Sequence, residues 1–139
     1  MLPVILLVDD DPTTNFLSTR LLKRLGVGEE IVVALNGFEA LQQLQQRCFV
    51  GEAVGSACPD LVLLDVNMPV MDGFEFLEAY QQLPAEQRRN TLVVMLTTSM
   101  LATDRQRAEQ LPVADFLTKP LTREKLATVL RQHFDIELP

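Results

Sequence analysis

The sequence of 139 residues has no tryptophan, one tyrosine and one histidine, and its 12 lysine and arginine residues are outnumbered by 19 acidic ones. The formal net charge of -7 repels phosphate backbones and anionic lipid surfaces, which argues against non-specific nucleic-acid or membrane-surface binding. The longest apolar stretches, such as Val4 to Val8, are far shorter than the roughly 20 residues of a bilayer span. The N-terminus also lacks the basic flank and cleavage site of a signal peptide. The sequence therefore predicts a cytoplasmic protein with no membrane and no nucleic-acid partner.

Cysteine is scarce as well, and Cys48 and Cys58 are the only two. They form no Cys-x-x-Cys pair and have no nearby histidine, so a structural zinc site is excluded. In a reducing cytoplasm we expect two free thiols. Their spacing of ten positions also allows a bond that would close a loop if the pair were oxidised.

The hydrophobic fraction of 47% suits one ordinary globular domain with a single sizeable core. Short runs rich in Val, Ile and Leu alternate with longer amphipathic segments from end to end. These runs are too short for helices and suit parallel strands buried on both faces. The predicted strands are Val4 to Val8, Ile31 to Leu35, Leu61 to Leu64, Leu92 to Leu96 and Ala114 to Leu117. The pattern predicts a βα unit repeated five times.

The helix signals agree with this division of the chain. Segments 16–25 and 126–134 carry apolar residues at helical spacing. Asn36 with Glu39 resembles a capping box, and Thr122 can cap the last helix. Segment 104–111 is mostly polar, which predicts a weakly packed, mobile helix.

Polar side chains follow four of the predicted strands at their C-terminal ends, where open parallel sheets bind ligands. They are Asp9, Asp10 and Asp11 after the first strand, Asp65 and Asn67 at the third, Thr97 and Thr98 at the fourth, and Lys119 at the fifth. Clustered carboxylates repel one another unless a hard divalent cation such as Mg²⁺ neutralises them. A facing lysine supplies a second positive charge suited to a phosphoryl oxygen. The set predicts a phosphoryl site with Mg²⁺ as its cofactor.

Four motifs at these strand ends resemble the receiver domain of two-component response regulators, the CheY-like group. They are Leu6 to Asp11 (LLVDDD), Leu63 to Gly73 (LLDVNMPVMDG), Met95 to Thr98 (MLTT) and Thr118 to Pro120 (TKP). The resemblance spans essentially the whole chain. It implies a flavodoxin-like (βα)5 fold with a doubly wound five-stranded parallel sheet, a bacterial origin, and a single receiver domain over residues 1–139 with a folded core of about 3–135.

The resemblance also implies a role for each acidic residue. Asp65 would be the phosphoacceptor, a nucleophile that attacks a phosphohistidine of a sensor histidine kinase or histidine phosphotransfer protein and becomes an acyl phosphate. Asp9, Asp10, Asp65 and the backbone carbonyl of Asn67 would hold Mg²⁺, Asp10 directly and Asp9 partly through water. Asp11 would be a turn residue.

Three further residues would read out the phosphoryl group. By resemblance, Lys119 would pair with Asp65 before phosphorylation and with the phosphate afterwards, and the Lys119-Pro120 bond would be cis. The Thr97 hydroxyl would then bond the phosphoryl oxygen, and Phe116 would rotate inward behind it. These movements would switch the face formed by the fourth helix, fifth strand and last helix.

The sequence departs from the family pattern in three places. Thr98 stands where the family mostly has a smaller residue, Phe116 replaces the commoner tyrosine, and Gly51 to Cys58 lengthens a loop before the third strand. Only twenty residues follow Lys119, too few for an output domain, so we expect a separate output or target protein. A phosphorelay shuttle and a free adaptor both satisfy this expectation.

Three alternatives share parts of the pattern. Haloacid-dehalogenase-like phosphatases need a second acid two residues after the nucleophile, where this chain has Asn67, so turnover of external substrates is not expected. A flavodoxin-type FMN carrier would need a phosphate-binding loop after the first strand, where this chain has acids. A phosphorylation-independent pseudo-receiver would be expected to lack an acid or the lysine, and both are present.

Overall fold

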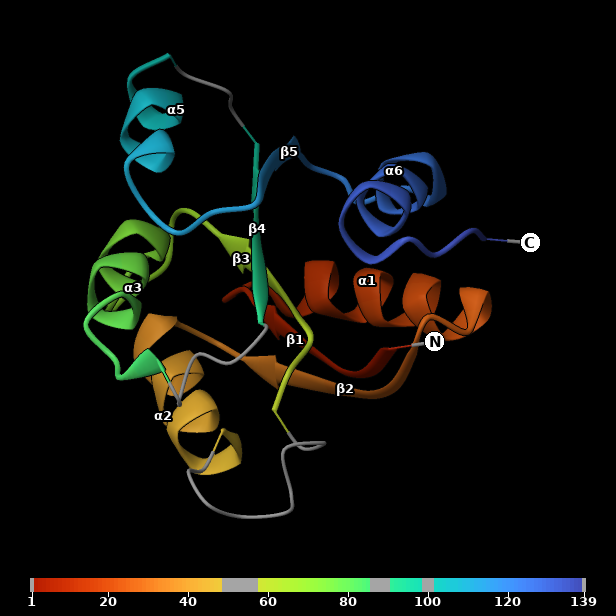
Figure 1. Ribbon diagram of the computed structural model, residues 1–139, viewed down its shortest axis with the longest axis horizontal. Helices are drawn as coiled ribbons and strands as arrows, with labels where there is room; N and C mark the ends of the chain where they lie inside the picture. The colour runs from red at the N-terminus through yellow and green to blue at the C-terminus, as the bar shows by residue number, and fades with distance from the viewer. Residues whose placement is uncertain (1, 49–57, 86–90, 99–101, 139) are drawn as a thin grey trace.

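The computed structural model describes residues 2–48, 58–85, 91–98 and 102–138, and these form one parallel sheet with helices on both faces (Figure 1). In chain order the elements are β1 (Leu2–Val8), α1 (Pro12–Leu25), β2 (Gly28–Ala34), α2 (Gly37–Arg47), β3 (Leu61–Asp65), α3 (Gly73–Tyr80), β4 (Leu92–Thr97), α5 (Ala102–Glu109), β5 (Asp115–Thr118) and α6 (Arg123–Phe134). The strand order is β2-β1-β3-β4-β5. This order reverses direction at β1, so the sheet is doubly wound, and the predicted flavodoxin-like (βα)5 fold is confirmed.

The predicted strands match the observed ones to within three residues. All five residues of β3 are buried, as its continuous apolar run predicts. The largest difference is at β2, which begins at Gly28 rather than Ile31 because Glu29 and Glu30 extend the strand. These two side chains are exposed on an edge strand, so no apolar pattern marks where the strand begins. Backbone pairing with β1 keeps this part of β2 extended.

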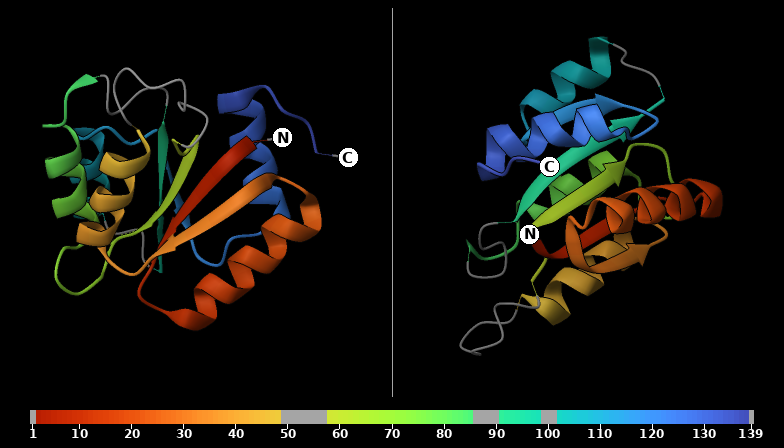
Figure 2. Two further views of the ribbon diagram at one scale, coloured as in Figure 1. Left: turned by 90° about the horizontal axis from the view of Figure 1, so that it is seen from below. Right: turned by 90° about the vertical axis from the view of Figure 1, so that its right-hand side faces the viewer.

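Two hydrophobic clusters hold the layers together, one on each face of the sheet. Figure 2 shows α1 and α6 together on one face and α2, α3 and α5 on the other. Side chains of β1 alternate between them: Leu6 and Val8 join the α2–α3–α5 side, whereas Ile5 and Leu7 join the α1–α6 side. No helix in the described part of the chain combines the length and apolar character needed to cross a membrane.

The helix starts agree with the predicted caps, with one correction. Thr122 accepts a hydrogen bond from the backbone N–H of Lys125, and Asn36 accepts one from that of Glu39. The Glu39 carboxylate, however, accepts from the backbone N–H of Leu35 rather than from Asn36, so the box is shifted by one residue. Each cap still satisfies a donor that the first helical turn leaves without a partner.

Cys48 and Cys58 form a disulfide, with their Cα atoms 4.6 Å apart, so the expectation of two free thiols is wrong for this structure. The physical reason is topological, because the end of α2 and the approach to β3 meet within the same buried cluster. Residues 51–57 of the predicted loop lie outside the described part of the chain.

Gly73 lets α3 begin directly against the end of β3. Its backbone N–H donates to the carbonyl of Val66 at 2.9 Å. A Cβ added here would collide with the backbone carbonyl of Asp65 and would lie 3.0 Å from the Met95 methyl and 3.1 Å from the Val66 Cα. The glycine therefore fixes how closely α3 approaches the strand that ends at Asp65.

We expect Gly73→Ala to lower the free energy of unfolding by about 1–3 kcal/mol, because the new methyl group must displace backbone atoms rather than a flexible side chain. Urea unfolding monitored by circular dichroism measures the change. Glu78→Ala, which alters an exposed position of the same helix, is the control. A Gly73→Ala loss no larger than that of the control would contradict the proposed close contact.

Candidate functional site

Three carboxylates meet at the C-terminal edge of the sheet. Asp9 directly follows β1 and Asp65 ends β3, and these strands are neighbours with Val8 opposite Leu64. Ligand atoms of Asp9, Asp10 and Asp65 all lie within 4.8 Å of one another. Asp9 and Asp65 are buried, with 6% and 8% of their surface exposed, whereas Asp10 is exposed. Burial places two of the three negative charges where water screens them poorly.

The ammonium group of Lys119 lies between the two buried carboxylates. Its Nζ is 2.6 Å from Oδ2 of Asp9 and 3.2 Å from Oδ1 of Asp65. The backbone N–H of Lys119 donates to the carbonyl of Thr97, and the Lys119-Pro120 bond is cis, as the family resemblance implies. The expected contact with Asp65 is therefore present, and the structure adds a shorter contact with Asp9 that the sequence did not indicate.

The electrostatics of this group follow from burial and charge. Burial and the neighbouring charge of Asp9 raise the pKa of Asp65 above its ordinary value, although Lys119 partly opposes the shift. Burial disfavours the charged form of Lys119, but its hydrogen bond to Asp9 and the charges of both carboxylates outweigh that cost and raise the pKa of Lys119. One lysine thus leaves the carboxylate pair short of positive charge.

Backbone N–H groups hold the two buried carboxylates, and a side-chain amide holds the backbone of Asp9. Oδ1 of Asp9 accepts from the backbone N–H of Asp11 at 2.9 Å, and Oδ1 of Asp65 accepts from that of Val66 at 2.9 Å. The side-chain amide of Asn15 donates to the Asp9 carbonyl at 2.8 Å. Asn15 is buried and was not predicted; its position on the inward face of α1 is the sequence signal that could have found it.

Asp11 serves the helix rather than the acidic cluster. Its carboxylate accepts hydrogen bonds from the Thr14 hydroxyl at 2.8 Å and from the Thr13 backbone N–H at 3.1 Å. These two bonds lower the pKa of Asp11. Asp11 is thus the N-cap of α1, before Pro12, in agreement with its expected place in a turn.

The predicted hydroxyl and amide residues lie at or just beyond the C-terminal ends of β3 and β4. Thr97 is the last residue of β4, is only 2% exposed, and lies opposite Thr118 of β5. Thr98 is exposed directly after it. Asn67 is exposed in the loop after β3, two positions beyond Asp65.

Phe116 is the second residue of β5, two positions before Thr118, and lines a cavity of about 190 Å³ between this strand and α5. The phenylalanine is partly buried and packs against the cluster on the α2–α3–α5 face. Ala108 is the buried residue of α5, in keeping with the predicted weak packing of this polar helix. The other residues that line the cavity are Arg105, Glu109, Val113, Ala114 and Asp115.

The donor set fits a hard divalent cation. Asp9, Asp10 and Asp65 offer oxygen ligands within the span that one ion can bridge, and oxygen is the ligand that Mg²⁺ prefers. The raised pKa of Asp65 shows that more positive charge would stabilise its ionised form. The arrangement can therefore hold a cation beside a nucleophilic carboxylate and a lysine.

Comparison with known proteins gives consistent matches. Residues 5–131 match the family model of the response regulator receiver domain. The chain is 38% identical over 116 residues to the response regulator Rcp1 of Synechocystis, covering 84% of this chain and 76% of Rcp1. It is 36% identical over 129 residues to the sensor protein GacS of Pseudomonas syringae, covering 92% of this chain but only 13% of GacS.

Among solved structures, the chain resembles the receiver domain of the sensor histidine kinase PA1611 from Pseudomonas aeruginosa, with a TM-score of 0.75 and 26% identity over 96% of this chain and 98% of the other. That structure contains a magnesium ion coordinated in its active-site cleft.

We expect Asp65→Asn to raise the free energy of unfolding at pH 7, because it removes a charge that burial and Asp9 disfavour. Since the pKa of Asp65 is higher in the folded state, the wild type loses stability as pH rises from about the ordinary value of 3.8 through the folded value. Below that pH range Asp65 is protonated in both the folded and the unfolded protein, so the stabilisation of Asp65→Asn relative to the wild type should vanish. Urea unfolding of both proteins at pH 7 and near pH 3 measures the difference in their free energies of unfolding. An equal increase in the variant at both pH values would contradict the raised pKa of Asp65.

Proposed function

Because the chain belongs to the response regulator receiver domain family, we propose that Asp65 accepts a phosphoryl group from a phosphohistidine of a sensor histidine kinase or histidine phosphotransfer protein. One observation carries the proposal: the carboxylate that ends β3 is paired with Lys119 and lies against two further carboxylates. A nucleophile, a phosphate-pairing cation and a metal-binding cluster thus share one strand edge.

In the proposed reaction, a carboxylate oxygen of Asp65 attacks phosphorus and the bond between phosphorus and the donor imidazole nitrogen breaks. The bonding electrons leave with the imidazole, and an acyl phosphate forms. Lys119 and the Val66 N–H both contact Oδ1 of Asp65, so we assign the new bond to Oδ2. These two contacts hold the carboxylate in place while the phosphoryl donor approaches.

We assign the cation to Asp9, Asp10, Asp65 and the backbone carbonyl of Asn67. Mg²⁺ bound there would neutralise the carboxylates and the charge that develops on the phosphoryl oxygens. The magnesium ion in the PA1611 receiver supports the choice of metal. Lys119 contributes a second positive charge beside Asp9 and Asp65 and moves its hydrogen bond from the carboxylates to a phosphoryl oxygen.

The signal would pass from the phosphoryl group to the face formed by α5, β5 and α6. The Thr97 hydroxyl donates to a phosphoryl oxygen, and Phe116 moves into the space behind it. The cavity beside Phe116 and the limited burial of α5 support a face that can rearrange at low cost. Differential contacts of this kind commonly change partner affinity by about 1–3 kcal/mol.

We further propose that the domain acts as a cytoplasmic, stand-alone regulator whose output resides in a separate target protein. Asn67 stands where related phosphatases need a second acid, which supports a signalling module rather than an enzyme that turns over external substrates. The acidic net charge of -7 supports a protein partner rather than nucleic acid.

Incubation with Mg²⁺ and acetyl phosphate tests the phosphoacceptor directly. We expect intact mass spectrometry to show a gain of one phosphoryl group in the wild type and none in Asp65→Asn or in the presence of a chelator. No gain in the wild type, with Mg²⁺ binding established separately, would reject the phosphoacceptor role and favour the phosphorylation-independent pseudo-receiver.

The metal assignment has its own test. We expect Asp10→Asn to weaken Mg²⁺ binding about tenfold or more, because a negatively charged oxygen ligand is lost. Isothermal titration calorimetry measures the affinity. Glu29→Gln removes the same charge from exposed β2 and should leave the affinity within about twofold of the wild type, as expected for a distant screened charge. Equal losses in both variants would indicate a general charge effect and not a ligand.

A further inference from the structure

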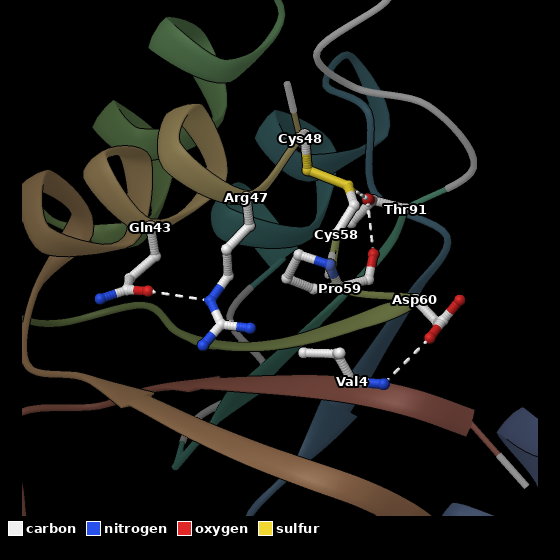
Figure 3. The surroundings of a disulfide bond; sticks show 8 residues. All are labelled: Val4, Gln43, Arg47, Cys48, Cys58, Pro59, Asp60 and Thr91. Atoms are coloured by element: carbon white, nitrogen blue, oxygen red, sulfur yellow. Dashed lines mark hydrogen bonds between the residues drawn. A yellow bond between two sulfur atoms is a disulfide. The ribbon is translucent and has the colours of Figure 1, made fainter. Parts of the chain in front are cut away.

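Figure 3 shows the Cys48–Cys58 disulfide, which joins the end of α2 to the segment before β3. This segment lies at the N-terminal end of β3, whereas Asp65 lies at its C-terminal end. Cys48 is the C-cap residue of α2, and Cys58 precedes β3, the strand whose other end carries Asp65. Both cysteines are buried, with 0% and 6% of their surface exposed. The bond therefore joins a helix end to the start of the central strand inside the hydrophobic core.

The Cys58 side of this bond is fixed firmly to the sheet. The sulfur of Cys58 lies 3.5 Å from the Thr91 hydroxyl, which donates to the Pro59 carbonyl at 2.7 Å. The Asp60 carboxylate accepts from the backbone N–H of Val4 at 3.1 Å (Figure 3). These contacts bind the approach to β3 to its neighbours on both sides, independently of the disulfide.

The Cys48 side depends more on the disulfide. The backbone N–H of Cys48 donates to the carbonyl of Leu44 within the same helix. Arg47 joins this helix end to the sheet through an ion pair with Glu30 at 2.8 Å, but half of the Glu30 side chain is exposed and such pairs contribute little. Loss of the disulfide would therefore free the end of α2 rather than the start of β3.

The other end of α2 contacts the loop that follows Asp65. The backbone N–H of Gly37 donates to the carbonyl of Met71 at 2.8 Å. A Cβ on Gly37 would lie 2.8 Å from the Met71 Cγ, so the helix start and the loop are in close contact. The disulfide thus completes a closed ring made of α2, residues 66–72 and β3, with Asp65 as a member.

We propose that Cys48 and Cys58 are a reversible thiol–disulfide site, and that its oxidation by a low-molecular-weight disulfide such as oxidised glutathione stabilises α2 and the loop beside Asp65. The redox argument rests on the proposed cytoplasmic function, because disulfides in that compartment are mostly transient or redox-sensing. The cysteines lie at the ends of elements, where local opening exposes them without global unfolding.

The proposed oxidation of Cys48 and Cys58 proceeds by two successive thiol–disulfide exchanges. A thiolate of Cys48 or Cys58 attacks oxidised glutathione, forms a mixed disulfide and releases one glutathione thiolate. The second cysteine thiolate then attacks the protein sulfur of that mixed disulfide and releases the other glutathione. Two protein thiols are oxidised and one glutathione disulfide is reduced to two thiols. The two protons lost by the protein thiols are taken up by the two released glutathione thiolates, so there is no net release of protons.

The first test is a glutathione redox titration of the native protein, quenched with an alkylating reagent and read by intact mass. We expect the pair to change between dithiol and disulfide while circular dichroism stays native. Two outcomes would overturn the proposal. The thiols could remain reduced even in oxidised glutathione alone, or the disulfide could resist reduced glutathione until urea unfolds the chain.

The second test compares amide hydrogen exchange in the oxidised and reduced wild type. We expect reduction to speed exchange at Gly37 and Cys48 at least about threefold, as opening of α2 becomes easier. The Cys48→Ser/Cys58→Ser variant, with and without reductant, controls for the reductant itself and should not respond to it.

Unchanged exchange at Gly37 in the reduced wild type would overturn the coupling between the disulfide and the loop. Neither test measures phosphorylation, so a failure of either is distinct from a failure of the proposed phosphotransfer at Asp65.

Discussion

The contact of Lys119 with two buried carboxylates is the interaction on which the site depends. Lys119 follows β5 at one edge of the sheet, whereas Asp65 ends β3 and Asp9 follows β1. The Lys119 side chain therefore extends from the end of β5 to the C-terminal ends of β1 and β3. It links three strand ends that strand pairing alone does not connect. Without its charge, Asp9 and Asp65 would repel each other in a poorly screened environment.

The arrangement lowers the stability of the folded protein at neutral pH in a way that suits the proposed reactivity of Asp65. The raised pKa of Asp65 means that its ionised form is disfavoured in the folded state, yet the ionised form is the nucleophile that a phosphoryl acceptor needs. A single lysine reduces the repulsion without removing it, which supports the proposed binding of a divalent cation by the cluster. The same shortage of positive charge is consistent with the proposed binding of a metal and a phosphoryl group beside Lys119.

Much of the fold was predictable because each buried strand carries its own apolar pattern, and because Asn36 and Thr122 mark the starts of α2 and α6. The acidic cluster followed from residues at strand ends, and the cis Lys119-Pro120 bond from the family resemblance. The contact of Lys119 with Asp9 and the Asn15 hydrogen bond did not, because both join side chains whose relative positions only the packed sheet determines. The disulfide was not the expected state for a different reason: the compartment argued for free thiols, and the spacing of ten positions allowed a bond without showing that the two sulfurs meet.

Burial and the charge of Asp9 disfavour the ionised form of the Asp65 carboxylate, and positive charge bound beside it would stabilise that form. Titration of Asp65 in a protein labelled with ¹³C at the aspartate carboxyls, followed by NMR with and without Mg²⁺, tests this most directly. We expect a pKa above the ordinary value of 3.8 without the ion, a fall when Mg²⁺ is added, and a further rise in Lys119→Met without the ion. An Asp65 that titrates at its ordinary value and ignores both Mg²⁺ and the loss of Lys119 would contradict the account.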